Sequence, residues 1–404
     1  MSRRLSSAFI QQRALVLMNS VLGFISLLNN IGDDVSSAVL DFFTSGRLPK
    51  DLNETVISLI PKVINPSSAK DYRPIAFCNT VYKCISKMIS ARLSEVLPDI
   101  VDSNQGAFIK HRSWAHNIMI FQDLLKGYTR KNISARCIMK IDLSKAYDMV
   151  DWEFVEDLLR VLCFPSWFIS WIMTCLKGTN YHPRLNERIQ GSFKGKKGLR
   201  QGDPMSPLLF VLIMDYLTRL LRQSSKEKGF GFHRLCKNLR LMNLCFADDL
   251  VIFCKGNLNS IRLTQDAFER FCNDTGLSAN TLKSHIYFGG VRDEIKSKIL
   301  NIVKIEEGGF PLKYLGVNLR PTKWKAEDCG IILDKLNKNL KYWVSRNLSF
   351  AGRAQLIHSV LLAIRNFWMN IFIIPSKITA AIDKSCRDFL WVLSGNRSKL
   401  HRAS

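Results

Sequence analysis

The chain has 404 residues, of which 47% are apolar and 23% charged, and these proportions exclude general disorder. Its 58 lysines and arginines exceed its 34 acids and give a net charge of +24, which favours a polyanionic partner such as nucleic acid. The 11 cysteines include no CxxC pair and no Cys/His set with zinc spacing, so they indicate buried thiols in a reducing compartment.

The N-terminal residues contain one stretch that needs a membrane check. Residues 14–28 (ALVLMNSVLGFISLL) are apolar and follow three arginines. The stretch is shorter than the roughly 20 apolar residues that a membrane span requires, and an asparagine and two serines interrupt it. We therefore expect a helix of the fold or an extension, with an anchor or targeting segment as the alternative, and we do not expect a membrane partner.

Apolar periodicity predicts the remaining elements in chain order. They are a helix at 33–46, a strand at 56–61, a basic loop at 66–74, a helix at 81–97, a strand at 136–143, helices at 152–162 and 166–176, a Gly-rich basic loop at 194–200, a long helix at 207–222, strands at 240–246 and 250–254, and a helix at 261–275. Beyond Pro311 the chain is basic and helical, with Leu333, Leu336 and Leu340 on one helix face. The order predicts an α+β fold.

Three aspartates stand where strands end. Asp142 closes the strand at 136–143, and Asp248 and Asp249 lie at the turn between two apolar strands. Nucleotidyl transfer needs two divalent ions roughly 3.5–4 Å apart, held by hard oxygen ligands. On adjacent strands these three carboxylates would meet despite their separation in sequence. The alternative interpretation is that Asp-Asp is ordinary turn chemistry, but charge beside an apolar core is expensive unless it is used.

Two basic segments suit a polyanion. The first, residues 184–200, contains Lys196, Lys197 and Arg200. The second, residues 335–365, contains Lys335, Lys338 and Lys341 with aromatic side chains interleaved. Each run by itself is also compatible with a solvated face, but together with the acids they indicate a nucleic-acid channel.

Four segments, taken in order, resemble the reverse transcriptase domain of LINE-type (non-LTR) retrotransposons, especially those of plant genomes. They are residues 59–75 (LIPKVINPSSAKDYRPI), 140–152 (KIDLSKAYDMVDW), 194–207 (KGKKGLRQGDPMSP) and 244–256 (LCFADDLVIFCKG), and residues 275–284 (TGLSANTLKS) and 312–316 (LKYLG) fit the same pattern. The resemblance implies a right-hand polymerase with fingers, a ferredoxin-like palm and a helical thumb. It divides the chain into an N-terminal extension at 1–32, fingers and the start of the palm at 33–134, palm at 135–310 and a thumb-like region at 311–404.

The resemblance also implies roles for individual residues. Asp142, Asp248 and Asp249 would bind two Mg²⁺ ions, with Mn²⁺ as a possible substitute. Lys62 and Arg73 would hold the incoming deoxynucleoside triphosphate, Tyr147 would lie beneath its sugar, Gln201 and Gly202 would pack beside template and nucleotide, and Lys283 would protonate pyrophosphate. The expected partners are an RNA template and a DNA primer, in a nuclear or cytoplasmic ribonucleoprotein. Tyr147 as a plain core aromatic remains an alternative.

The chain departs from the family pattern in several places. Residues 105–108 (QGAF) have glycine where serine is usual, and no endonuclease or RNase H domain flanks the matched region, so we expect a piece of a longer element, truncated at both ends. We interpret Asp148 and Asp151 as structural or helix-capping residues. The main alternative function is a catalytically dead relic that folds and binds RNA. A splicing factor of the intron-maturase kind is a weaker one, because residues from 314 onward match retroelements.

Overall fold

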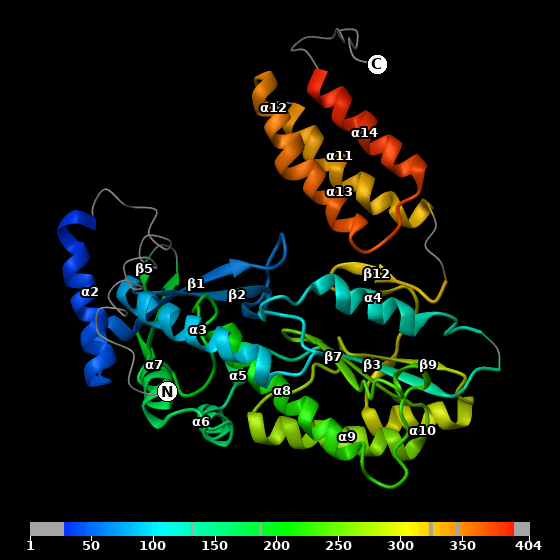
Figure 1. Ribbon diagram of the computed structural model, residues 1–404, viewed down its shortest axis with the longest axis horizontal. Coiled ribbons are helices and arrows are strands. Elements are labelled where there is room, and N and C mark those ends of the chain that lie inside the picture. The colour runs from blue at the N-terminus through cyan, green and yellow to red at the C-terminus, as the bar shows by residue number, and fades with distance from the viewer. Residues whose placement is uncertain (1–27, 131, 186–187, 323–325, 345–347, 392–404) are drawn as a thin grey trace. The chain divides into compact units, whose positions relative to one another are not determined.

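The computed structural model describes residues 28–130, 132–185, 188–322, 326–344 and 348–391 (Figure 1). They fall into two compact units. The first unit takes its residues from Met1–Trp114 and Arg130–Gly308, and the second from Ala115–Thr129 and Gly309–Ser404. Mixed helices and sheets confirm the predicted α+β class.

A five-stranded central sheet forms the middle of the first unit. Its strands, in spatial order, are β10 (Glu306–Glu307), β9 (His285–Gly289), β3 (Arg136–Ile141), β8 (Asp249–Lys255) and β7 (Asn243–Phe246). β3 pairs antiparallel with both β8 and β9, and β8 pairs antiparallel with β7. β3 is flanked on both sides and nearly all its residues are buried, including Arg136, and its sequence is apolar except for Arg136 and Lys140.

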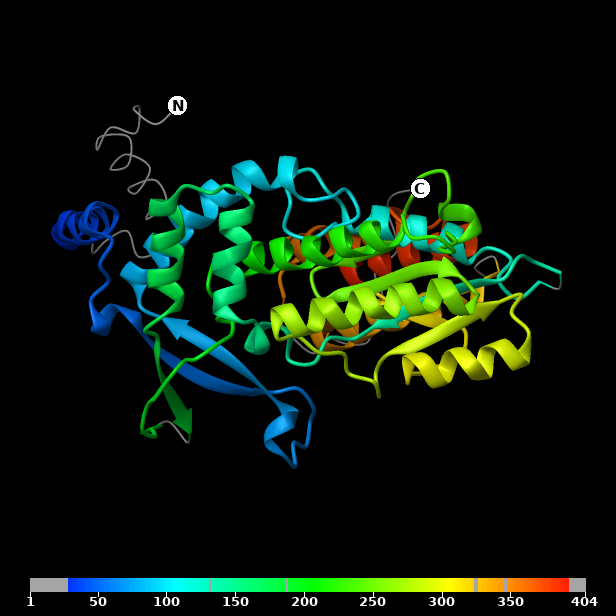
Figure 2. The same ribbon diagram turned by 90° about the horizontal axis from the view of Figure 1, so that it is seen from below.

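Three helices lie together on one side of the central sheet (Figures 1 and 2). They are α8 (Ser206–Ser224), α9 (Leu258–Thr275) and α10 (Asp293–Val303). The Leu-rich α8 is buried over most of its length, as its sequence predicted. α9 ends at Gly276, whose φ of 76° closes the helix in the left-handed conformation that glycine favours. The predicted helix stop is therefore confirmed.

An outer sheet completes the first unit. β1 (Glu54–Pro61) pairs antiparallel with β2 (Tyr72–Cys78) and parallel with β4 (Asn180–Leu185), which in turn pairs with β5 (Arg188–Ile189) and β6 (Phe193–Lys194). In Figure 2 the β1–β2 hairpin extends away from the helices. The helices of this region are α2 (Leu28–Ser45), α3 (Thr80–Ile100), α5 (Ala146–Met149), α6 (Trp152–Val161) and α7 (Ser166–Leu176), with short 3₁₀ turns at η2 (Lys50–Asn53), η3 (Ala69–Asp71) and η4 (Arg234–Cys236).

The capping interpretation of Asp151 is confirmed. Its carboxylate accepts hydrogen bonds from the backbone N–H groups of Glu153 at 2.7 Å and Phe154 at 3.3 Å, at the start of α6. These donors have no partner within the helix, so an N-cap acceptor of this kind stabilises it by about 1 kcal/mol.

The second unit consists of a short hairpin and a group of helices. Its elements are α4 (Trp114–Leu125, which begins at the last residue of the first unit), β11 (Leu312–Tyr314), β12 (Val317–Leu319), η5 (Ala326–Cys329), α11 (Gly330–Val344), α12 (Phe350–Leu356), a π-helical turn η6 (Ile357–Leu361), α13 (Leu362–Met369) and α14 (Ser376–Trp391). α11 packs against α13 and α14, burying Ile332, Leu336 and Leu340. The prediction that the chain is helical beyond Pro311 is confirmed for α11 to α14, and the β11–β12 hairpin precedes these helices.

One segment belongs to the same compact unit as residues far along the chain. Residues 115–129 group with the second unit, and the predicted division into fingers, palm and thumb stays a prediction. Phe121 contacts Tyr314 edge-on at 5.0 Å between ring centroids, and the Gln122 side chain donates to the carbonyl of Arg320 at 2.9 Å. These partners are almost 200 residues further along the chain, so local periodicity carried no sign of them.

Within the described ranges, no helix is long and apolar enough to cross a membrane. The apolar stretch at 14–28 lies, apart from its last residue, outside these ranges.

Candidate active site

The three predicted aspartates lie at one end of the central sheet. β3 and β8 pair up to Ile141 opposite Leu250, so Asp142 and Asp249 follow as the next residues on the two strands. Continuing the register puts their Cα atoms on the order of 5 Å apart. Phe246 pairs with Asp249 to close the β7–β8 hairpin, which leaves Ala247 and Asp248 as a two-residue turn. The register therefore brings together acids that are 106 residues apart in sequence.

The surroundings of Asp249 favour its uncharged form. Burial raises the pKa of Asp249, the neighbouring Asp248 raises it further, and Asp142 adds to the effect, whereas Lys140 opposes it. Asp142 and Asp249 are half-buried, and Asp248 is exposed. Like charges are gathered here at a partly desolvated edge, an arrangement that is typical of functional sites.

The side chains do not already form a metal cage. In the parts of the chain that the structure describes, no three His, Cys, Asp or Glu side chains are placed to hold an ion together. The donor chemistry nevertheless fits magnesium, which prefers carboxylate oxygens and keeps several waters, so that two or three convergent aspartates suffice.

The backbone of Asp142 is held by the segment that carries Lys283. The Asp142 N–H donates to the Ser284 hydroxyl at 3.0 Å, and the Asn280 N–H donates to the Asp142 carbonyl at 2.7 Å. Ser284 is buried and donates in turn to the Asn280 carbonyl at 2.8 Å. Lys283 itself is exposed next to these residues. Its role in proton transfer stays a prediction.

Tyr147 lies beside the acids, on the short helix α5. Its ring stacks on Phe210 of α8, with centroids 4.8 Å apart and planes 18° from parallel. Burial raises the pKa of Tyr147 to about 12, and the charge of Asp248 contributes to that rise. Tyr147 is half-buried, and the stack on Phe210 is a packing contact.

The two predicted triphosphate-binding cations lie on the β1–β2 hairpin. Arg73 is exposed on β2, opposite Ile60. Lys62 follows β1, is exposed, and donates from Nζ to the carbonyl of Lys70 at 2.9 Å. Burial raises the pKa of Asp148, whereas Lys145 and Lys62 lower it. Lys62 is thus within electrostatic reach of the segment that follows Asp142.

The loop with Gln201 and Gly202 runs against the outer sheet. The Ala76 N–H donates to the Gln201 carbonyl at 2.9 Å. Gly202 has a φ of 114°, and a Cβ there would lie 2.9 Å from the Ala76 carbonyl oxygen. Any larger residue would be strained and would clash, which explains the glycine. Beside this loop is a cavity of about 370 Å³ whose lining includes Gln201 and the exposed Lys196 and Lys197.

The comparisons with known proteins match the same residues. The family model described as reverse transcriptase (RNA-dependent DNA polymerase) matches residues 60–319. This chain belongs to the reverse transcriptase family. The match covers the three aspartates, Tyr147 and the Gln201 loop. With the mixed helices and sheets, it supports the right-hand polymerase fold.

The relatives are proteins of retrotransposons. The chain is 25% identical over 373 residues to the transposon TX1 uncharacterized 149 kDa protein of Xenopus laevis, covering 90% of this chain and 28% of that protein. It is 27% identical over 308 residues to the Pol polyprotein from the type-2 retrotransposable element R2DM of Drosophila melanogaster, covering 72% of this chain and 28% of the polyprotein. The chain thus spans about a quarter of the length of each. These matches confirm the resemblance to non-LTR reverse transcriptases.

Among solved structures, apo telomerase from Candida tropicalis is similar with a TM-score of 0.47 and 13% identity, covering 89% of this chain and 68% of that one. At this TM-score the similarity carries no argument.

One predicted nucleic-acid contact is wrong. Arg200 was expected to bind nucleic acid, but its side chain is only 3% exposed. Its guanidinium donates to Asn53 at 2.9 Å, to the Thr55 hydroxyl at 3.3 Å and to the Cys175 carbonyl, and it lies 4.1 Å from the centre of the Tyr82 ring. Although burial lowers the pKa of Arg200, the nearby Tyr82 and Asp203 more than compensate. Arg200 is a structural cation.

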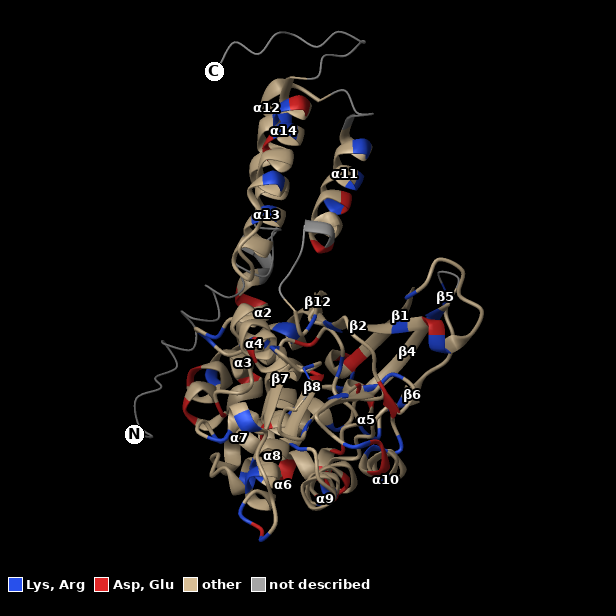
Figure 3. Cartoon of the chain, turned by 90° about the vertical axis from the view of Figure 1, so that its right-hand side faces the viewer, with Lys and Arg blue, Asp and Glu red and all other residues tan. Residues whose placement is uncertain are grey.

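Lys335, Lys338 and Lys341 are placed differently. All three are exposed on α11 of the second unit, three residues apart, opposite its buried Leu336 and Leu340. Figure 3 shows basic residues along this helix. Their exposure is compatible with phosphate binding, which stays a prediction.

Two residues near the acids were missed as site residues. Gln105 is buried and its side chain accepts from the Ala247 N–H at 3.2 Å, at the turn that carries Asp248. Ser284 supports Asp142. The signal in the sequence was weak, since Gln105 stood out only because the glycine after it departs from the family pattern.

Proposed function

We propose that this chain is the polymerising region of a non-LTR retrotransposon reverse transcriptase, which extends a DNA primer on an RNA template. The observation that carries the proposal is the β3–β8 register, which places Asp142 beside Asp249 and next to the turn with Asp248. Burial and the neighbouring acids raise the pKa of Asp249, so the site favours a counter-charge.

Reverse transcriptases generally use divalent metal ions, and Asp142, Asp248 and Asp249 are the residues that would hold two Mg²⁺ or Mn²⁺ ions here. Bound magnesium would supply activation of the primer hydroxyl and stabilisation of the triphosphate. Asp142 and Asp249 follow the last paired residues of β3 and β8, and their side chains would turn toward the ions. The bonds to Ser284 and Asn280 would hold the Asp142 backbone in place.

The remaining site residues fit the deoxynucleoside triphosphate and the template. Arg73 and Lys62, exposed on the β1–β2 hairpin, would pair with the phosphates. Tyr147, stacked on Phe210, would present its accessible part to the sugar. Gln201 and Gly202 would pack beside the template, and Lys283 would donate a proton to pyrophosphate.

The exposed lysines would bind the backbone of the nucleic acid. Lys196 and Lys197 lie beside the cavity next to Gln201, and Lys335, Lys338 and Lys341 line one face of α11. Contacts of this kind hold the duplex without reading its sequence.

Primer extension on an RNA template with purified protein and Mg²⁺ tests the proposal. We expect extension that stops on chelation, and we expect Asp248→Asn to reduce it by orders of magnitude with RNA affinity unchanged. Asp248 is exposed at a turn, so the substitution should leave the fold intact. Protein that binds RNA but extends no primer would contradict the proposal and support the alternative of a dead relic. Equal extension by the mutant would show that another enzyme produced the signal.

A further inference from the structure

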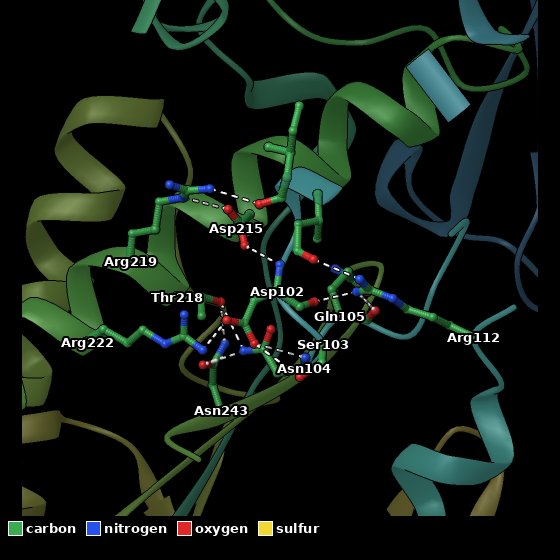
Figure 4. Close-up of polar contacts among 12 residues, drawn as sticks. Asp102, Ser103, Asn104, Gln105, Arg112, Asp215, Thr218, Arg219, Arg222 and Asn243 are labelled. Atoms are coloured by element: carbon green, nitrogen blue, oxygen red, sulfur yellow. Dashed lines mark hydrogen bonds and ion pairs between the residues drawn. The ribbon is translucent and has the colours of Figure 1, made fainter. Parts of the chain in front are cut away.

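A polar network surrounds Asp102, Asn104 and Gln105 (Figure 4). It joins the loop at residues 101–112 to α8 and to the edge strand β7. On the α8 side, Asp215 accepts from the Asp102 N–H at 2.9 Å, and Arg222 forms an ion pair with the Asp102 carboxylate. The Asn104 amide donates to the Thr218 hydroxyl at 3.1 Å. The loop is therefore fixed to a buried helix.

The same loop extends the central sheet by one backbone bridge. β7 is an edge strand, and Gln105 bridges Cys245 in parallel orientation. The Cys245 N–H donates to the Asn104 carbonyl and the Gly106 N–H donates to the Cys245 carbonyl, both at 2.9 Å. Arg112 stiffens the loop by donating to the Val101 carbonyl at 2.7 Å and the Gln105 carbonyl at 2.8 Å.

The Gln105 side chain reaches from this loop to the turn. Its Oε1 accepts from the Ala247 N–H at 3.2 Å and from the Ala107 N–H at 3.0 Å. The β7–β8 ladder ends at the pair of Phe246 and Asp249, so the sheet offers the Ala247 N–H no partner. Ala247 has a φ of 55°, in the left-handed region that an alanine rarely adopts. The bond from Gln105 therefore holds a strained turn in place.

The orientation of the Gln105 amide is determined by its neighbours. The backbone N–H groups of Ala247 and Ala107 both require an acceptor, so the amide oxygen of Gln105 must face them. Among the described residues, the buried Nε2 group has no hydrogen-bond partner. The Gln105 side chain is therefore oriented by the acceptor role of its Oε1.

We propose that Gln105 is a positioning residue: it fixes the Ala247–Asp248 turn and thereby the Asp248 carboxylate relative to Asp142 and Asp249. This inference rests on the proposed function. Gln105 acts through the backbone of the turn. Loss of its side chain would therefore misplace the Asp248 carboxylate and leave all three carboxylates present. Misplacement by about 1 Å can reduce a rate on the order of 100-fold.

The test compares Gln105→Met with Thr218→Val in the full chain. Each substitution preserves side-chain volume approximately and removes one acceptor shared by two N–H donors, since Thr218 accepts from Asn104 and from Asn243. Both should lower stability similarly. In Gln105→Met alone, amide hydrogen exchange at residues 244–249 should accelerate relative to β3 of the same protein. In primer extension, its kcat should fall on the order of 10–100-fold with KM for primer–template unchanged. Thr218→Val should reduce kcat less, because it removes a contact of the loop and leaves the bond from Gln105 to the turn.

Unchanged exchange at the turn in Gln105→Met would overturn the inference, whatever the activity. Accelerated exchange with a kcat reduction no larger than that of Thr218→Val would also overturn it, leaving a purely structural role. If the wild-type protein extends no primer, the proposed function fails, and the exchange measurement alone decides whether Gln105 holds the turn.

Discussion

The single acid Asp203 and the cluster of Asp142, Asp248 and Asp249, all in the first unit, have opposite surroundings. Asp203 is 2% exposed and accepts hydrogen bonds from the Tyr82 hydroxyl at 2.6 Å and from Ser86, close to the charge of Arg200. Asp249, at the end of the central sheet, faces Asp248 and Asp142 instead, and its pKa is raised. Both groups belong to segments that match the family model. Charge surrounded by complementary partners is typical of a structural site, whereas like charges gathered together are relieved by protonation or by a bound counter-charge.

The largest effect is expected from Asp249→Asn, which should reduce extension by orders of magnitude and yet stabilise the metal-free fold at neutral pH. The folded state raises the pKa of this carboxyl, so its contribution to stability is present in acid and is lost as the pH rises through the folded-state pKa. Thermal melts across the pH range should give a higher Tm for the mutant than for the wild type at neutral pH, and this difference should disappear in acid. A mutant that melts below the wild type at neutral pH would contradict this account.

The buried group of Arg200 and Asp203 should respond in the opposite way, because loss of its charge should destabilise the fold. Arg200→Met leaves Asp203 and several acceptors without their cation, and should cost about 3–5 kcal/mol. The exposed Lys197→Met should change stability by less than about 0.5 kcal/mol. Urea denaturation measures both, and RNA binding by the folded fraction should weaken only in Lys197→Met. Weaker RNA binding in folded Arg200→Lys would restore Arg200 as a residue that binds nucleic acid.

The exposed lysines of α11 in the second unit differ from the buried Arg200 and should contribute to nucleic-acid binding. Neutralising Lys335, Lys338 and Lys341 to glutamine should weaken binding of all duplex sequences alike. The slope of log affinity against log salt should fall by about 0.9 for each phosphate that the protein no longer neutralises. A control with the same change in net charge uses three exposed lysines of the first unit, Lys226, Lys228 and Lys237. Equal slopes in the two triple mutants would mean that overall charge, not α11, determines affinity.

The smallest effect concerns Tyr147, which has both packing and predicted substrate roles. Tyr147→Ala should raise ribonucleotide relative to deoxynucleotide incorporation, roughly tenfold, because a packed ring that crowds a 2′-hydroxyl is removed. Tyr147→Phe keeps the stack on Phe210 and should keep the discrimination. Competition assays with paired nucleotides measure the ratio. Loss of both activities in proportion would assign the ring to packing alone.

Much of the site was legible in the sequence, because its signals are local. An acid directly after an apolar strand and an Asp-Asp turn between two others predicted the strand ends, and the register confirmed their neighbourhood. The boundaries of α6 and α7 and the end of α9 were legible for the same reason, since caps and apolar periodicity depend on residues a few positions apart, whereas α9 begins three residues before its predicted start.

What the sequence alone determined is therefore the family, the α+β class and the three acids, since each is written in contiguous motifs. Tertiary structure decided which charges face solvent. Arg200 and Lys197 lie three residues apart in one basic run, yet only packing against Asn53, Thr55 and Cys175 buries the first. It also decided that Gln105 reaches the turn at Ala247, 142 residues away. Burial and hydrogen bonding between distant segments depend on how the chain folds back on itself, and no local pattern encodes them.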